Sequence, residues 1–422
     1  MADAAQQSEE LVTADGKPLR VSLAHAQRRQ KVRAVLLVAP LFIFIMVTFI
    51  VPIADMLFRS VENSIVKEFL PRSTKLLTQW DPSKKLLPSE EVFAAMVEDI
   101  KIGRKNRTIT RVGQRLNYEM SGMSSLFRSS GRKVKRINKS PYKPALIMAN
   151  KKWGDLETWK LIKQFSPSYT DGYFLAAVDA RRKTDGTLTR VSEETRIYIN
   201  LFLRTLKLSL IITIITFILG FPIAYLMAIL PTKRSNLLLI FVLLPFWTSL
   251  LVRTTSWIVL LQQQGVINEF LVFIGLIGND NRLQMIHNEI GTIVAMTHIL
   301  LPFMVLPLFS VMKTIPKSYV RAAISLGAHP WRAFWKIYFP NTVPGIGAGA
   351  ILVFILAIGY YITPELVGGT TGTFISNRIA YHISGSLNWG LGAALGVILL
   401  VVVSILYLVY DKIIGIDNMK LG

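Results

Sequence analysis

The sequence predicts an all-α, polytopic membrane protein with six transmembrane helices and one large extramembrane insert between the first two helices. Three observations support this fold class. Six segments reach the roughly 20 apolar residues that a helix needs to cross a bilayer. Of the 422 residues, 51% are hydrophobic, and the mean hydropathy is +0.42. The 48 Lys and Arg, against 26 Asp and Glu, are concentrated in the connections between these segments.

The composition excludes several other classes of protein. There is no cysteine, which rules out a disulfide framework, a Cys-ligated metal or cluster, and a cysteine nucleophile. The 5 histidines are scattered along the chain, so we expect no histidine-rich metal site. High hydrophobicity argues against a disordered chain or an ordinary soluble enzyme. A net charge of +22 in so apolar a chain is most simply explained by basic loops.

The predicted elements divide the chain into a tail over 1–33, a first membrane helix within 34–58, an insert over 59–200 and a five-helix core over 201–422. The first apolar segment is longer than the core of a signal peptide and follows about 33 mostly polar residues, so we interpret it as a retained anchor. The third segment contains Arg253 and the fourth contains His298. The six segments are 35–57, 206–229, 237–261, 290–312, 343–362 and 391–410.

The basic connections set the expected orientation. Lys and Arg cluster before the first segment (28–33), between the second and third (231–236), between the fourth and fifth (313–336), and at Lys412 and Lys420. With six helices all of these lie on one side. Because short cytoplasmic loops are enriched in Lys and Arg, we expect both termini in the cytoplasm.

The insert carries about +13 of the net charge, and we place it in the periplasm, since long loops do not follow the charge rule. Segments 88–101, with Ser89 as N-cap, and 153–165 are expected to be helical. The basic stretch 128–143 is interpreted as a solvated surface near anionic lipid headgroups rather than a nucleic-acid patch, because no nucleic-acid-binding motif accompanies it.

The connection 313–345 is amphipathic rather than membrane-spanning. Helical spacing of apolar residues from Pro316, and Gly327 as a C-terminal cap, predict one short helix. A second short helix is expected from Pro330 and is expected to end at Pro340 and Pro344. An exposed apolar and aromatic face at this point needs a protein partner or the lipid surface.

This connection resembles the cytoplasmic signature loop of ABC-importer permeases. Arg321, Ala322 and Ala323 are followed by Gly327, Ile337 and Phe339-Pro340 at the spacing of that signature. Arg321 replaces the usual Glu and Phe339 the usual Leu. Segments 243–268, 300–308 and 360–369 resemble the spermidine/putrescine-type subfamily. The resemblance covers roughly 200–422 and the first helix but not the insert.

The resemblance implies a type I importer permease in the bacterial inner membrane, forming half of an alternating-access pathway. Two ATPase subunits would dock on the coupling loop 313–342, a second permease, expected to be a different chain, would complete the pathway, and a periplasmic binding protein would deliver substrate. No phosphate-binding GxxxxGK[ST] occurs, so this chain is expected to be no enzyme and to bind no cofactor or metal, with ATP and Mg in the partner. The glycine-rich run 368–372 is interpreted as a flexible turn. The coupling residues are Arg321, Ala322, Ala323, Gly327, Ile337 and Pro340.

The sequence signal for residues of the substrate pathway is less specific than the signature of the coupling loop. Arg253 and Glu365 could form an external gate pair, or Glu365 could face a cationic substrate. Aromatic rings could bind a polyamine or similar amino compound through cation–π contacts, although helix packing explains them as well and an amino-acid derivative or opine-like substrate stays open. His298 is expected to be a hydrogen-bonded packing residue. The aromatic candidates are Trp247, Trp257, Tyr360 and Tyr361.

Two other functions remain as alternatives. A six-helix secondary transporter or channel would need intramembrane ion ligands or an inverted repeat, and neither is evident. A membrane-anchored nucleic-acid- or lipid-binding protein would explain the insert but leave the 322–340 pattern unused. We therefore expect no nucleic-acid partner.

Overall fold

The computed structural model describes residues 19–183 and 185–414, and it divides the chain into two compact units, 1–58 and 59–422. The tail over 1–18 and Lys420 lie outside the described residues. Five helices in the described part are long and apolar enough to cross a membrane, and a sixth span results if one bent helix pair is counted. The six-helix prediction is therefore confirmed, with one helix broken.

The first span is a helix with a widened turn. Helix α1 (Leu19–Ile45) continues through a π-helical turn (Met46–Ile50) into α2 (Val51–Arg59). The N–H of Val51 donates to the carbonyl of Met46. Such a turn fits next to Pro52, which has no N–H to offer the preceding turn. The predicted segment 35–57 lies inside the observed span Gln27–Arg59.

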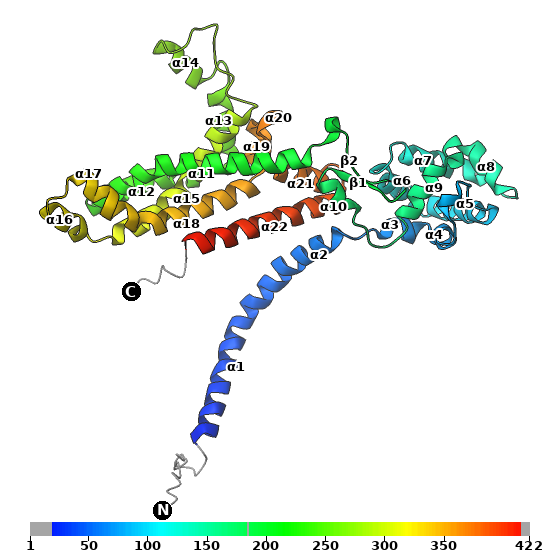
Figure 1. The fold of residues 1–422 in the computed structure, drawn as a ribbon, viewed down its shortest axis with the longest axis horizontal. Coiled ribbons are helices and arrows are strands. Elements are labelled where there is room, and N and C mark those ends of the chain that lie inside the picture. Colours follow the sequence, from blue (N-terminus) through cyan, green and yellow to red (C-terminus); the bar gives the residue numbers. More distant parts are fainter. Residues whose placement is uncertain (1–18, 184, 415–422) are drawn as a thin grey trace, which may run out of the picture. The chain divides into compact units, whose positions relative to one another are not determined.

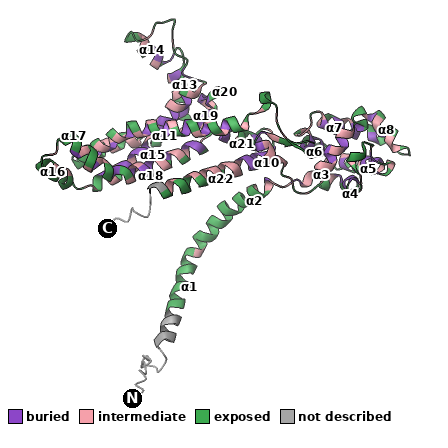
Figure 2. Ribbon diagram, viewed as in Figure 1, coloured by how far each residue is buried: buried purple, intermediate pink, exposed green. Residues whose placement is uncertain are grey.

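The insert folds around its own hydrophobic core (Figure 2). Trp153 and Trp159 are completely buried there together with Phe93 and Phe127. Each indole N–H is satisfied, Trp153 donating to Ser130 Oγ at 2.8 Å and Trp159 to the Trp153 carbonyl at 2.9 Å. The helices are α3 (Ser64–Phe69), α4 (Pro71–Leu77), α5 (Glu90–Lys105), α6 (Ile109–Asn117), α7 (Met123–Lys133), α8 (Tyr142–Ala149), α9 (Leu156–Gln164) and α10 (Gly172–Ala177).

The two helices expected in the insert begin close to their predicted positions. Ser89 occupies the N-cap position of α5, although its side chain makes no capping hydrogen bond. Helix α9 begins three residues later than expected, because the Asp155 side chain accepts from the N–H of Glu157 at 3.1 Å and caps the helix there. A β-hairpin of β1 (Ala180–Arg182) and β2 (Leu188–Arg190) then leads to the membrane core, with Arg181 opposite Thr189.

Three long helices form the centre of the membrane core (Figure 1). These are α11 (Tyr198–Ile229), α15 (Glu289–Thr314) and α18 (Phe339–Gly359). Helix α18 approaches α15 closely at its glycines: a Cβ on Gly349 would lie 2.7 Å from Met304 Sδ, and one on Gly345 would lie 2.9 Å from Val311 Cβ. These two glycines therefore allow the close packing of α18 against α15. Helix α22 (Trp389–Ile414) is the last span.

The third predicted helix, 237–261, is wrong as a single helix. Helix α12 (Thr232–Leu243) ends in a 3-10 turn (Leu244–Trp247), and α13 (Leu250–Leu261) begins after it, followed by α14 (Val266–Phe273). The two halves are bent by 95°. Pro245 cannot continue the backbone ladder, and Ser249 caps the new helix by accepting from the N–H of Val252. Thr254 of α13 contacts Thr363 of α19 at 3.1 Å between hydroxyl oxygens.

The second short helix expected at 330–340 is also wrong as a separate element. Helix α17 (Pro330–Ala333) passes through a π-helical turn (Phe334–Tyr338) directly into α18, giving one span over Pro330–Gly359. Pro340 lies in the first turn of α18, where its missing N–H is tolerated because the widened turn precedes it. The fifth span is thus longer than predicted at its amino end, and it stops at Gly359.

The connection 363–390 is mostly helical. It contains α19 (Ile362–Val367), α20 (Gly369–Gly372) and α21 (Ile375–Ser384). The glycine-rich run is a packed helical turn rather than a flexible one. A Cβ on Gly372 would lie 2.5 Å from Thr292 Oγ1, and one on Gly368 2.6 Å from the Gly372 carbonyl. Glycine is required here by close backbone approach.

Candidate coupling loop and transport pathway

The predicted coupling loop begins with helix α16 (Lys317–Ser325). Gly327 follows the C-cap residue of this helix and turns the chain away from it. Gly327 has φ +89°, a backbone conformation that glycine adopts without strain. Its N–H donates to the Ile324 carbonyl at 2.9 Å, and the N–H of Ala328 donates to the Ala323 carbonyl at 3.0 Å. This pair of bonds is a Schellman motif. The glycine of the signature is therefore the residue that stops the helix.

Helix α16 offers an exposed surface that is both basic and apolar. Arg321 and Ala322 are exposed and Ala323 is half-buried, and Leu326 is 89% exposed. The stretch 313–345 contains five basic residues and no Asp or Glu. Apolar side chains of this size on an exposed surface are typical of an interaction site. The other exposed apolar residues are Tyr319, Ile324, Trp331 and Trp335.

Aromatic side chains fix the following turn to the core. The ring of Phe334 lies 5.7 Å from that of Tyr225 on α11, and Tyr338 lies 5.2 Å from the same ring. Ile337 is half-buried beside them, whereas Pro340 is exposed. The signature residues thus form one segment, with an exposed helix at one end and a helix of the membrane core at the other.

Arg253 and Glu365 do not form an ion pair in the part of the chain that the structure describes. Glu365 accepts a hydrogen bond from Asn377 Nδ2 at 2.6 Å. Arg253 lies over the ring of Phe246, with its Cζ 5.9 Å from the centroid, and its buried Nε has no hydrogen-bond partner. The proposed gate is therefore absent from this conformation of the single chain.

A cationic cavity surrounds Glu365. The cavity, of about 340 Å³, is lined by three arginines in addition to this one carboxylate. Arg204 donates to the Thr370 carbonyl at 2.7 Å, and Arg378 lies 5.8 Å from the ring of Tyr381. The third arginine is Arg196. Like charges oppose binding of a cation next to them, so the surroundings of Glu365 disfavour its role as a cationic-substrate contact within this chain.

The aromatic candidates have different environments. Trp257 donates its indole N–H to His298 Nδ1 at 3.1 Å, as expected for His298 as a hydrogen-bonded packing residue. Trp247 is 74% exposed at the break between α12 and α13. Tyr361 is exposed, and Tyr360 packs against the core. The carbonyls of Tyr360 and Tyr361 accept from Ser376 and Asn377, so the backbone at this point is fixed.

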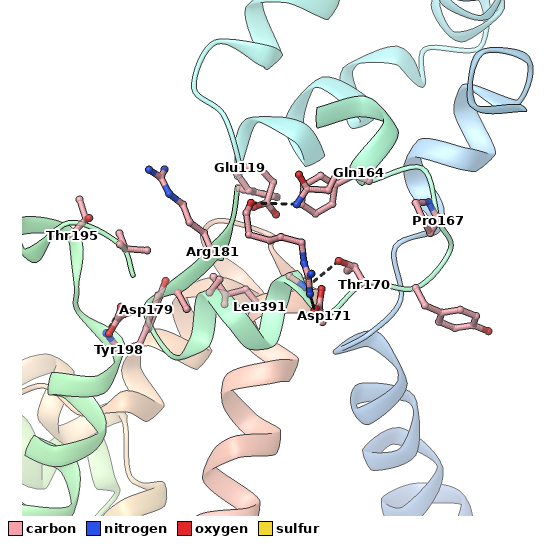
Figure 3. Close-up of a pocket in the computed structure, with 18 residues that line it drawn as sticks. Glu119, Gln164, Pro167, Thr170, Asp171, Asp179, Arg181, Thr195, Tyr198 and Leu391 are labelled. Carbon is pink, nitrogen blue, oxygen red and sulfur yellow. Dashed lines mark hydrogen bonds and ion pairs between the residues drawn. The ribbon is translucent and has the colours of Figure 1, made fainter. Parts of the chain in front are cut away.

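A pocket of about 460 Å³ lies where the insert meets the core (Figure 3), and no sequence pattern predicts it. It is lined by three carboxylates, and each is already engaged. Glu119 pairs with Arg115 at 2.9 Å and Asp171 pairs with Arg182. Asp179 is 3% exposed and accepts from the backbone at the start of α11. Glu119 and Arg115 are only four residues apart, whereas Asp171 and Asp179 have partners 11 to 20 residues away, beyond the reach of a local sequence pattern.

A second polar contact between segments lies near this pocket. The hydroxyl of Tyr198 on α11 lies 2.9 Å from His382 Nε2 on α21, and His382 Nδ1 lies 2.9 Å from Ser386 Oγ. Tyr118 of the insert donates to the Ser386 carbonyl at 2.8 Å. These residues form a chain of contacts that joins the insert to the outer ends of the core helices.

Comparison with known proteins places the core in one family. The family described as "Binding-protein-dependent transport system inner membrane component" matches residues 209–414. The spermidine/putrescine transport system permease protein PotB of Salmonella typhimurium is 35% identical over 226 residues, covering 54% of this chain and 78% of that protein. PotB of Escherichia coli is 35% identical, with 53% and 81% covered.

Other similarities are weaker. The inner membrane ABC transporter permease protein YdcU of Escherichia coli is 33% identical, covering 51% of this chain and 72% of that protein. A chain in a crystal structure of a bacterial alginate ABC transporter, in complex with an alginate pentasaccharide-bound periplasmic protein, has 19% identity and a TM-score of 0.46, with 54% and 82% covered.

The signature spacing, the helical membrane core and the similarity to the two PotB proteins lead to the same assignment. The matched region begins beyond the insert, at residue 209. The chain belongs to the family of inner-membrane components of binding-protein-dependent transport systems, and it is an ABC-importer permease of the polyamine-type subfamily.

Proposed function

We propose that the chain forms one half of an alternating-access pathway and that helix α16 is its contact with an ATPase subunit. The observation that carries this proposal is an exposed helix that stops at Gly327 and follows the membrane helix α15 after only two residues. A rigid helix at the end of a packed bundle transmits movement of a docked partner to the membrane core. ATP and Mg then belong to the partner, since this chain has no phosphate-binding loop.

The basic loops support an orientation in which α16 faces the cytoplasm. The turn between α11 and α12 and the connection with α16 lie at one end of the core, and the insert lies at the other (Figure 1). Because Lys and Arg are retained on the cytoplasmic side, both termini would be cytoplasmic and the insert periplasmic. A periplasmic binding protein and a second, different permease chain complete this arrangement.

The substrate class follows from the relatives. The PotB proteins are named for spermidine and putrescine transport, so we infer a polyamine or similar small amine for this chain. The exposed ring of Trp247 and that of Tyr361 could contact ammonium groups through cation–π interactions. Within the described residues the cavity at Glu365 is cationic, so the carboxylates of the pathway would come from the second permease.

A co-purification experiment tests the ATPase contact. The wild-type complex should retain the ATPase during purification, whereas Gly327→Asp should lose it or leave ATP hydrolysis uncoupled from transport. Gly186→Asp is a matched control, because Gly186 also has positive φ and open space around it but lies in the insert. Equal ATPase retention and equal transport by both variants would contradict the contact at α16. A wild-type complex that transports without any ATPase would favour a transporter of another class.

Uptake measurements test the substrate. Membrane vesicles with the complete transporter and its binding protein should accumulate labelled spermidine or putrescine only when ATP is present inside. Lysine and an opine serve as competing substrates. If an amino-acid derivative is imported and neither polyamine competes with it, the polyamine inference is wrong while the ATPase contact can still stand.

A further inference from the structure

A basic cavity lies where the insert meets the first residues of α22. Its volume is about 290 Å³, at the small end of the range for ligand sites. Arg59, Arg111 and Arg115 line it, and Glu62 is the one carboxylate among the lining residues. Ser64, Gln114, Tyr118, Tyr173 and Trp389 also contribute. A small site with three guanidinium groups and one carboxylate is suited to a small anionic group.

Arg115 is held rigidly in this cavity. Its side chain is 2% exposed, and its Cζ lies 4.6 Å from the ring centroids of both Phe165 and Tyr173. Nε donates to Asn63 Oδ1 at 2.9 Å, and Nη1 pairs with Glu119 at 2.9 Å. The planar group is therefore held by two hydrogen-bonding partners and by two aromatic rings.

One amino group of Arg115 has no hydrogen-bond acceptor within the described part of the chain. Its Nη2 is buried and has no hydrogen-bond partner among the residues that the structure describes. A buried N–H without an acceptor is unfavourable, and a guanidinium carries no acceptor with which it could relieve this by itself. Because Nη2 is itself buried, it is the positive charge of Arg115 in the cavity wall, rather than this N–H, that favours an anion in the cavity.

The cavity lies at the start of the last membrane span. Arg59 is the last residue of the span Gln27–Arg59, and Trp389 is the first residue of the span Trp389–Lys412. The Cζ of Arg59 lies 5.6 Å from the centroid of the Trp389 ring. Tryptophan and arginine at this position are typical of the membrane–water interface, which is also the level of lipid phosphates.

We propose that this cavity binds a phosphate group, supplied by a phospholipid headgroup or by inorganic phosphate. Arginine matches phosphate because its fork of N–H donors binds two oxygens at once. Arg115 provides a fixed positive charge in the wall of the cavity. Arg111 is exposed and lies over the ring of Phe69 at 6.0 Å, so it can complete the site from the solvent side. The bound group would fasten the insert to the start of α22.

The test uses the full-length chain purified in detergent and stripped of lipid. Phosphatidylglycerol is added, and lipid retention is measured by native mass spectrometry for the wild type, Arg111→Gln and Arg128→Gln. Arg128 is a matched control, since it is an exposed arginine on helix α7 of the same insert outside the cavity. We expect one retained lipid in the wild type and in Arg128→Gln, and at least fivefold less in Arg111→Gln.

A second measurement distinguishes the source of the phosphate. Thermal unfolding of the three proteins is recorded in inorganic phosphate and in chloride at equal ionic strength. Selective lipid retention supports the site and identifies a headgroup. A phosphate-specific rise in the unfolding temperature that Arg111→Gln abolishes, without lipid retention, supports the site and identifies the free ion. If neither response occurs, or if Arg128→Gln loses it equally, the proposal is overturned.

Discussion

The carboxylate of Asp179 accepts a hydrogen bond from the backbone N–H of Ile199 at 2.8 Å, in the first turn of α11. Its other oxygen accepts from the N–H groups of Ile197 and Tyr198 at 3.1 and 3.2 Å. These are N–H groups that a helix start leaves without intrahelical partners, and the negative charge also suits the positive end of the helix dipole. The insert therefore supplies the cap of the first core helix.

Replacing Asp179 by alanine should destabilise the chain by about 1–2 kcal/mol, the usual cost of losing such a cap. Thermal unfolding of the detergent-solubilised protein measures it. Asp171→Ala is the control, because Asp171 makes an exposed ion pair with Arg182 and such pairs contribute little. A smaller effect for Asp179 than for Asp171 would contradict the capping role.

At Gly327 we expect asparagine to be the best tolerated substitution, alanine the next and valine the worst. A Cβ at this position meets nothing within 4 Å, so the penalty comes from φ +89° alone, and that conformation costs β-branched residues most. We expect the association with the ATPase to be strongest for the Asn variant, weaker for Ala and weakest for Val. Equal association for Asn and Val would show that the left-handed conformation is irrelevant to docking, and the same series at Gly186 controls for general loss of stability.

Arg321 should contribute to docking through its charge. The stretch 313–345 has five cations and no anion, so an acidic partner surface is expected to complement it. Arg321→Glu should reduce ATPase affinity at low salt by more than Arg321→Gln does, and the difference should shrink as the salt concentration rises. Affinity that is the same for both variants at every salt concentration would rule out an electrostatic role.

His382 should make stability depend on pH. Burial, with a smaller contribution from the Arg378 charge, lowers the pKa of His382 to about 4. The neutral ring contacts Tyr198 and Ser386. In the unfolded chain His382 binds a proton near pH 6.5, but in the folded chain it does so only near pH 4. Protonation therefore favours the unfolded state, so the stability of the fold is unaffected above pH 6.5 and decreases as the pH falls towards 4.

The loss is at most about 3 kcal/mol. It should appear as a fall in unfolding temperature between pH 6.5 and 4 that levels off below pH 4. His382→Gln cannot titrate, so its unfolding temperature should vary less over that interval. His329→Gln, at the exposed end of the core, is the control. A pH dependence that both variants share with the wild type would mean that other groups cause it.

Gly390 should be intolerant of any side chain because of Tyr173. A Cβ on Gly390 would overlap the ring of Tyr173, which is buried between the insert and α22. Gly390→Ala should therefore cost about 1–3 kcal/mol, as overpacking usually does. Combining it with Tyr173→Ala should remove most of that added cost. If the two effects are simply additive in unfolding measurements, the contact does not hold the insert to the core.

Local patterns accounted for the features that depend on neighbouring residues. Apolar segments located the membrane spans, and Gly327 was placed at the end of a short helix because only a local conformation was needed. The sharp break near Pro245 was missed, because prolines also lie inside intact spans at Pro222 and Pro302. Whether such a proline bends or breaks a helix depends on what can pack around the freed backbone.

The sequence by itself determined the membrane class, the number of spans, the signature of the coupling loop and hence the family. The tertiary structure alone decided that Glu365 lies among arginines, that Asp179 caps α11, and that Arg115 keeps an unpaired donor in a basic cavity. The physical reason is the distance along the sequence over which each interaction acts. Hydrophobicity and helix termination are set within a few residues, whereas contacts between charged, polar and aromatic groups in these sites join segments up to 330 residues apart, such as Arg59 and Trp389.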